Sequence, residues 1–257
     1  MKNSIVIIGM GEMAGVFARG FLRNSYPVIP VTRDMDMQTV ADETGPVQMV
    51  LVAVAENDCQ SVLTNLPDAW RTNTVLLQNE LLPRDWADHN LTDVTVISVW
   101  FEKKKGMDYK VLIPSPAFGA QAAVLQSSLA SIDIPCRIVK DDAALLHELV
   151  LKNVYIITTN VCGLVAAGTV SELWKDHEEL ARTVANEVID IQEYLTEQKF
   201  DRELLIRDML IAFEGDPDHN CMGRSAPARL ERALKLADEA GLAVGKIREI
   251  KASLATL

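Results

Sequence analysis

A glycine-rich turn directly after the first apolar run limits the possible folds of this chain more than any other feature. Residues 5–8 read Ile-Val-Ile-Ile, and Gly9, Gly11 and Ala14 follow with the spacing G-x-G-x-x-A. The run predicts a strand, and the apolar residues after the turn recur at helical spacing. Gly9 would permit the tight turn, Gly11 would let backbone approach a pyrophosphate, and Ala14 would let helix and strand pack closely. The pattern predicts a dinucleotide-binding strand–turn–helix unit.

The first 140 residues continue this organisation. Short runs rich in Val and Ile alternate with segments of helix length, which is typical of an α/β doubly wound sheet. The expected strands are residues 4–9, 27–31, 48–54, 74–77, 94–101, 110–113 and 136–139, and the expected helices are residues 12–24, 58–66 and 117–131. We therefore expect an N-terminal Rossmann domain over residues 1–140.

Beyond residue 140 the strand signals nearly stop. Asp141 or Asp142 can cap a long helix that runs towards Gly168, and residues 169–172 (Thr-Val-Ser-Glu) have the spacing of a capping box. Further helices are expected over residues 178–198, 202–213 and 226–240, the last capped by Ser225 and stopped at Gly241. These signals predict an all-α C-terminal domain over residues 141–257.

Composition excludes several classes of partner. The chain has 25 Lys and Arg against 36 Asp and Glu, a formal net charge of −11, whereas nucleic acids and anionic membranes require a basic face. No apolar run approaches the ~18 residues of a membrane span. The four cysteines show no CxxC spacing, so we expect no disulfide framework, no structural metal site and a cytoplasmic location.

The end of the second expected strand indicates which dinucleotide binds. NAD sites usually place an acidic residue there to bind the ribose hydroxyls, whereas this chain has Thr32 and Arg33. Thr32 can hydrogen-bond a phosphate and Arg33 can pair with it in a bidentate way, which favours NADP(H). Asp34 or Asp36 would instead serve an NAD site if the strand ended later.

The helix expected after residue 141 is apolar on almost all sides, which is typical of a buried helix. Lys152, Asn153 and Asn160 stand out there because buried polar groups must be satisfied, and the two asparagines share a face. A lysine fixed near a nicotinamide site is a reasonable proton donor to a carbonyl oxygen. The alternative is an ordinary i,i+4 ion pair with Glu148 on an exposed stripe.

The polar loop at residues 215–224 gathers functional groups of several kinds. Arg224 could clamp a carboxylate, and His219 could supply or relay a proton. The alternative is a polar Asx-turn connector between two helices.

A run of three lysines at residues 103–105 precedes Gly106. We interpret it as a solvated turn between two strands, in preference to a phosphate-binding segment.

The glycine turn, Arg33, residues 75–79 (Val-Leu-Leu-Gln-Asn) and the helix with Lys152 and Asn160 come in the order seen in ketopantoate reductases, which the chain resembles over most of its length. The resemblance implies a Rossmann domain followed by a helical domain like that of 6-phosphogluconate dehydrogenase. It also implies NADPH as the cofactor, a small 2-oxo acid or related carbonyl as the substrate, and possible dimerisation through the helical domain.

The motif and the resemblance together define the candidate site. Lys152 matches the family's acid/base, Asn160 its substrate contact, and Asn79 an asparagine near the nicotinamide and the substrate. The expected cofactor-binding residues are Gly9, Met10, Gly11, Glu12, Met13, Ala14, Thr32, Arg33 and Asn79. The expected substrate-binding residues are Asn153, His219, Arg224 and Ser225.

The chain also departs from the family pattern. Ala55 and Glu80 stand where the family has a lysine and a glycine, and Ile156 replaces an asparagine. Ser225 falls at about the position of a substrate-holding glutamate. The alternative hypothesis is therefore a non-catalytic NADP-binding regulator or sensor with a degenerate site.

Overall fold

The structure is a computed structural model that describes residues 2–255, and the chain divides into two compact units between Leu149 and Val150. The division falls inside a long helix, later than the boundary that the sequence indicates. The first turns of that helix belong with the first unit, where Glu148 accepts a 2.5 Å hydrogen bond from Arg137. No helix among residues 2–255 is long and apolar enough to cross a membrane.

The first unit is built on a seven-stranded sheet in the order β2-β1-β3-β4-β5-β8-β9. Its strands are β1 (Ser4–Ile8), β2 (Val28–Val31), β3 (Val47–Val52), β4 (Thr74–Leu76), β5 (Thr95–Ile97), β8 (Ser115–Phe118) and β9 (Cys136–Ile138). β1 to β5 are parallel, and β8 pairs antiparallel with β5. The strand order reverses between β1 and β3, and ligands of doubly wound sheets bind at such a switch point.

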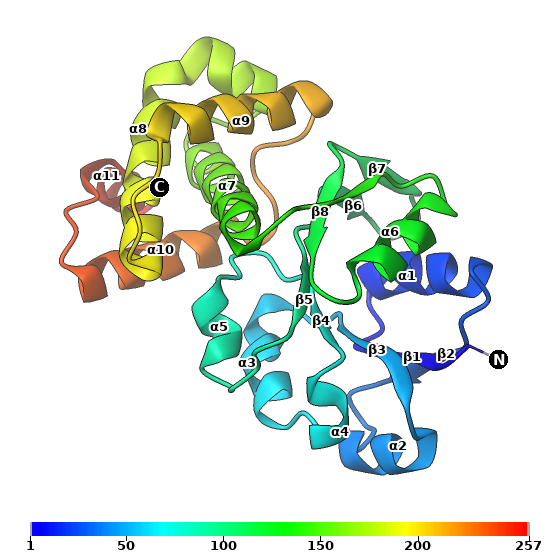
Figure 1. Cartoon of the computed structure of the whole chain (residues 1–257). Helices are drawn as coiled ribbons and strands as arrows, with labels where there is room; N and C mark the ends of the chain where they lie inside the picture. The colour runs from blue at the N-terminus through cyan, green and yellow to red at the C-terminus, as the bar shows by residue number, and fades with distance from the viewer. Residues whose placement is uncertain (1, 256–257) are drawn as a thin grey trace. The chain divides into compact units, whose positions relative to one another are not determined.

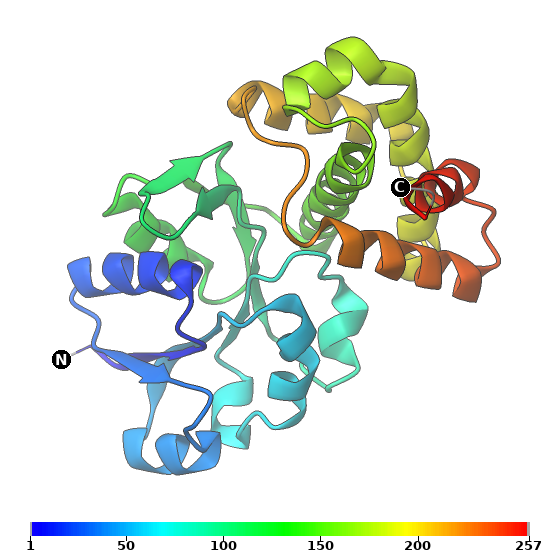
Figure 2. The same ribbon diagram turned by 180° about the vertical axis from the view of Figure 1, so that it is seen from behind.

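Helices lie on both faces of this sheet (Figures 1 and 2). They are α1 (Glu12–Arg23), α2 (Met37–Thr44), α3 (Glu56–Thr64), α4 (Asp68–Arg71), α5 (Pro83–Ala87) and α6 (Ala122–Ala130). Ile5 and Ile7 point to the face covered by α1 and α6, where Phe17 and Leu125 join one buried cluster. Because side chains alternate along a strand, Val6 points to the opposite face of the sheet, where it is also fully buried.

Two expected elements around β8 were wrong. The helix expected over residues 117–131 begins only at Ala122, because Ala117 pairs with Ile97 and Ile138 in the sheet. The strand expected over residues 94–101 is divided between β5 and β6 (Phe101–Lys103), which forms a separate hairpin with β7 (Tyr109–Val111). The turn at residues 104–108 joins these two strands, as the lysine run indicates.

The regular elements of the second unit are helices within its described residues. It holds most of α7 (Asp142–Gly163), followed by α8 (Val170–Thr196), α9 (Arg202–Gly215), α10 (Ala226–Ala240) and α11 (Gly245–Leu254). Asp141, in the first unit, caps α7 by accepting a hydrogen bond from the Ala144 N–H. The predicted capping box at Thr169 and Glu172 is confirmed at the start of α8.

The ends of the helices differ from expectation in two places. α7 ends at Gly163, before the expected stop at Gly168, because its last carbonyls are already used by the tight turn at residues 164–166. Ser225 occupies the N-cap position of α10, but its side chain makes no capping hydrogen bond. Gly241 ends α10 in the left-handed conformation, as predicted.

Candidate functional site

The glycine turn after β1 is shaped by two constraints at Gly9. Its φ of +88° lies in the left-handed region that favours glycine, and its N–H donates to the Val31 carbonyl at 2.9 Å. A Cβ at this position would lie 2.8 Å from Val54 Cγ1. Gly9 therefore lets the chain turn sharply between β1 and α1 while it stays packed against the end of β3.

A cavity of about 870 Å³ opens beside this turn, at the carboxyl ends of β1, β2 and β3. Its lining includes Gly9, Met10, Gly11, Thr32, Arg33, Asp34, Ala53, Val54, Ala55 and Asp58. A Cβ built on Gly11 would meet no atom within 4 Å, so open space adjoins the backbone where the motif requires close ligand approach. The residues present therefore fit the adenosine and pyrophosphate portions of a dinucleotide.

The far end of the cavity carries opposed charges. Arg33 Nη2 lies 3.7 Å from Asp58 Oδ2, and both side chains are mostly exposed. Asp34 also lines the cavity, whereas Asp36 caps α2 by accepting hydrogen bonds from the Thr39 N–H and hydroxyl, both at 2.8 Å. These bonds hold the pKa of Asp36 below its usual value. The two acidic residues named as alternative ribose ligands thus have different surroundings.

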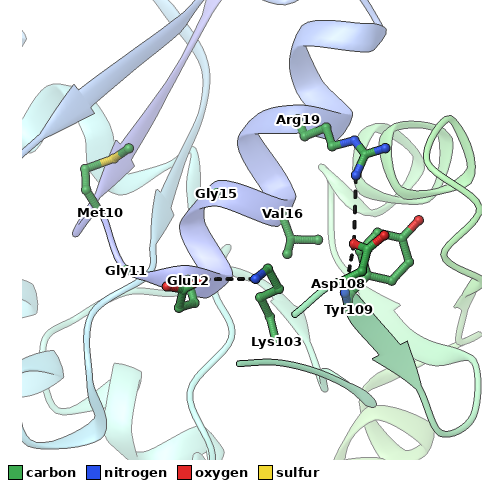
Figure 3. Close-up of a pocket in the computed structure, with 9 residues that line it drawn as sticks. All are labelled: Met10, Gly11, Glu12, Gly15, Val16, Arg19, Lys103, Asp108 and Tyr109. Atoms are coloured by element: carbon green, nitrogen blue, oxygen red, sulfur yellow. Dashed lines mark hydrogen bonds and ion pairs between the residues drawn. The ribbon is translucent and has the colours of Figure 1, made fainter. Parts of the chain in front are cut away.

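The remaining residues of the turn have separate roles. Ala14 is fully buried in the cluster under α1, and Met13 packs against that cluster. Glu12 is exposed and faces another cavity, lined also by Met10 and Gly11 (Figure 3). Met13 and Ala14 are therefore packing residues of the motif, whereas Glu12 lies at a cavity wall.

Asn79 is held beside the end of β3. Its Nδ2 donates to Glu56 Oε1 at 3.0 Å, and the neighbouring Gln78 Nε2 donates to the Val52 carbonyl at 2.7 Å. Glu80 follows with φ +62°, the left-handed conformation that favours glycine. Glu80 therefore has a backbone conformation that a glycine would adopt without strain.

In the second unit, Lys152 lies on α7 as a half-buried side chain. Its ammonium lies 5.5 Å from the centroid of the Tyr155 ring. Burial, and then the positive charge of Arg229, lower the pKa of Lys152 to about 7. Lys152 can therefore take up or release a proton near neutral pH.

Asn160 and Arg229 form a buried hydrogen bond between α7 and α10. Arg229 Nη1 donates to Asn160 Oδ1 at 3.1 Å, and Asn160 Nδ2 donates to the Cys221 carbonyl at 3.3 Å. Sequence reasoning missed Arg229, although it falls on the apolar stripe of α10 with Ala226 and Leu230. A charged residue on an apolar stripe was the signal that could have found it.

Asn153 has a different environment from Asn160. It is 2% exposed and its Nδ2 donates to Gln192 Oε1 of α8 at 2.9 Å. The bond satisfies a buried amide between two helices. The structure therefore places this expected substrate-binding residue in the helical core.

The loop after α9 folds back on the start of α8. His219 Nδ1 lies 3.6 Å from the buried Asp216 Oδ2, and the Cys221 N–H donates to the Gly168 carbonyl at 3.0 Å. Arg224 is exposed and Ser225 is half-buried. Within residues 2–255, no group of three His, Cys, Asp or Glu side chains is arranged to hold a metal ion.

Comparison with known proteins connects this fold to one group of solved structures. The 2-dehydropantoate 2-reductase of Methylococcus capsulatus superposes with a TM-score of 0.69 at 11% identity, covering 98% of this chain and 96% of that one. The chain has the ketopantoate reductase fold. A dimeric ketopantoate reductase of Staphylococcus aureus gives a TM-score of 0.62 at 16% identity, with 98% of each chain covered.

The same fold occurs in a D-mandelate dehydrogenase in complex with NADH, with a TM-score of 0.66, 12% identity and 96% of each chain covered. No protein-family model and no curated protein sequence matches the chain. At these identities the likeness shows the fold. The predicted ketopantoate reductase architecture, a Rossmann sheet followed by an all-α region, is confirmed.

Proposed function

We propose that the chain is an NAD(P)H-dependent oxidoreductase that reduces a small 2-oxo acid or a related carbonyl compound. A bound nicotinamide cofactor supplies the hydride for such a reduction. The cavity at the Gly9–Gly11 turn offers the binding site, and proteins with this fold include reductases of a 2-oxo acid and a D-mandelate dehydrogenase. The substrate class follows from the chemistry that these proteins share.

The observation that carries the proposal is the lysine on α7. Reduction of a carbonyl requires a proton at the oxygen, and a general acid works best when its pKa lies near the operating pH. Lys152, with a pKa of about 7, meets this requirement, whereas an exposed lysine with its ordinary value of 10.5 would not. In this proposal Lys152 donates the proton to the developing alkoxide.

Polar side chains would orient the substrate. We assign the amide of Asn79, anchored by Glu56, to the nicotinamide and substrate carbonyl, and Asn160 to the substrate. Arg224 is the candidate for a carboxylate clamp, because a guanidinium donates to carboxylate oxygens, and His219 is the candidate for supplying or relaying a proton. We further propose a homodimer formed through the helical unit.

Arg33 supports NADPH as the preferred cofactor. Its guanidinium is exposed in the cavity and lies 3.7 Å from the Asp58 carboxylate. A 2′-phosphate would give it a bidentate partner. Asp34 and Asp58 lie in the same cavity and would serve the ribose hydroxyls of NADH, so cofactor preference depends on this balance of charge.

A second candidate function is a non-catalytic NADP-binding regulator. Asn160 is 6% exposed, and both ends of its amide are satisfied by Arg229 and the Cys221 carbonyl. An asparagine engaged in this way contributes to packing without any substrate. Ala55, Glu80 and Ile156 also depart from the ketopantoate reductase pattern, which favours a non-catalytic role.

One experiment separates these two functions. The purified protein is mixed with NADPH and a panel of 2-oxo acids, and the nicotinamide absorbance is followed. We expect consumption of NADPH with at least one compound. Binding of NADPH without consumption by any member of the panel would favour the regulator, and no binding of either dinucleotide would contradict both candidates.

Gly11 allows a test of the cofactor site alone. A Cβ there meets nothing in the protein and the backbone conformation is extended, so Gly11→Ala should melt within about 2 °C of the wild type. The added methyl group would occupy the space needed by the pyrophosphate, so NADPH should bind at least about tenfold more weakly. Fluorescence titration and thermal melting give the two readouts.

The matched control is Gly245→Ala at the start of α11, which lines neither cavity and where the atom nearest to a Cβ is Glu187 Oε1 at 4.0 Å. This variant should bind NADPH as the wild type does. Equal affinities of Gly11→Ala and wild type would contradict the placement of the pyrophosphate.

A further inference from the structure

A cavity of about 360 Å³ lies between α1 and the β6–β7 hairpin, next to the glycine turn (Figure 3). It shares Met10 and Gly11 with the larger cavity. Two ion pairs line it: Lys103 Nζ lies 3.2 Å from Glu12 Oε2, and Arg19 Nη1 lies 4.0 Å from Asp108 Oδ1. The hairpin therefore brings a cation to the first residue of α1.

The Lys103 ammonium is positioned by its own hairpin. It donates to the Lys104 carbonyl at 2.8 Å and to the Met107 carbonyl, and its side chain is only 19% exposed. An ammonium has three N–H donors, and two of them bond to hairpin carbonyls while Nζ forms an ion pair with Glu12 at 3.2 Å. This differs from a solvated turn lysine, which would extend into water.

Glu12 creates an electrostatic problem for the proposed cofactor. The open space beside Gly11 is where the pyrophosphate would lie, and Glu12 is the next residue, with its carboxylate at the wall of the adjoining cavity. Neighbouring like charges repel each other, and both the α1 N-terminus and a nearby cation reduce that repulsion. Lys103 places a fixed cation at this point.

We propose that Lys103 is a pyrophosphate-binding residue of the cofactor site. On binding, the third N–H of Lys103 donates to a phosphate oxygen and the ion pair with Glu12 gives way, while the two hairpin carbonyls keep Nζ in place. Glu12 thus holds the donor in the free protein and competes with the cofactor for it. This inference rests on the proposed dinucleotide function of the chain.

The test compares ligands with and without a pyrophosphate. Lys103→Met should weaken NADPH, NADH and ADP by about tenfold each, because each loses one charge-assisted hydrogen bond. Binding of adenosine 2′-monophosphate, which lacks the pyrophosphate, should be unchanged. The matched control is Lys105→Met, an exposed lysine of the same turn, which should bind all four as the wild type does.

Glu12→Gln is a second, independent test, because this variant keeps Lys103. It should tighten NADPH about threefold, because the amide no longer competes for Nζ. Lys103→Met should still weaken NADPH in the Glu12→Gln background. If the double variant binds as tightly as Glu12→Gln alone, or if Lys103→Met matches Lys105→Met, the proposal is overturned. Failure of the wild type to bind any dinucleotide would instead overturn the proposed function.

Discussion

Replacement of Lys152 by methionine should lower kcat for 2-oxo acid reduction about a thousandfold, because the carbonyl oxygen loses its positioned proton donor. The affinity for NADPH should stay within about twofold of the wild type, since Lys152 is proposed to act on the substrate and not on the cofactor. Steady-state kinetics and a fluorescence titration on the same preparation give both values.

Loss of stability would not explain such a result. The pKa of Lys152 is lowered in the folded protein from 10.5 to about 7, so the unfolded chain binds the proton more tightly. Burial of the protonated amine therefore lowers the free energy of unfolding, and this penalty has its full size below about pH 7. It decreases as pH rises from about 7 to 10.5. Lys152→Met should melt no lower than the wild type at neutral pH.

The matched control is Lys175→Met, an exposed lysine on α8. It should leave both kcat and NADPH affinity unchanged. Wild-type turnover in Lys152→Met would remove Lys152 from the mechanism.

The second large effect is expected at Arg33. Arg33→Ala should weaken NADPH about tenfold, because the 2′-phosphate loses a charge-assisted bidentate partner. NADH has no such phosphate, so its affinity should change by less than about twofold. Titration of both cofactors against one preparation measures the ratio directly.

A variant of Asp58 gives a second test of the role proposed for Arg33. Asp58→Asn removes the carboxylate that lies 3.7 Å from the Arg33 guanidinium, so it should tighten NADPH relative to NADH. Arg23→Ala, an exposed arginine at the end of α1, is the control and should change neither affinity. Equal losses of NADPH and NADH in Arg33→Ala would contradict the 2′-phosphate role.

Local chemistry made several parts of the fold predictable. The turn at Gly9, the capping box at Thr169 and the stop at Gly241 each depend on a few neighbouring residues, and all three are present. Elements set by distant partners were harder to predict. Ala117 precedes the helix-forming residues 120–125, but its pairing with β5 and β9 makes it part of a strand.

Short helices were missed for a related reason. α2 buries only Val40 and Ala41, so its apolar periodicity is weak, and its start signal, Asp36, was considered as a ribose ligand. α4 and α5 are single turns, and α11 buries only Ile247 and Ile250. A hydrophobic pattern predicts a helix only when enough of one face is buried.

Candidate site residues were predictable where a motif or a mismatch marked them. Gly9, Arg33 and Lys152 were predicted as site residues because each breaks or completes a local pattern. Arg229 and Lys103 depend on tertiary neighbours: one is buried against Asn160, and the other is brought to Glu12 by a hairpin. Their proximity to other functional groups is visible only in the folded chain.

The pH dependence of kcat/KM for reduction tests most directly the central claim, that Lys152 donates the proton. Because the protonated lysine is the active form and its pKa is about 7, kcat/KM should be level at lower pH and fall about tenfold per pH unit above it. In Arg229→Met the bend should move to higher pH, since one opposing positive charge is gone. A profile that stays level to about pH 9 in both proteins would contradict the claim.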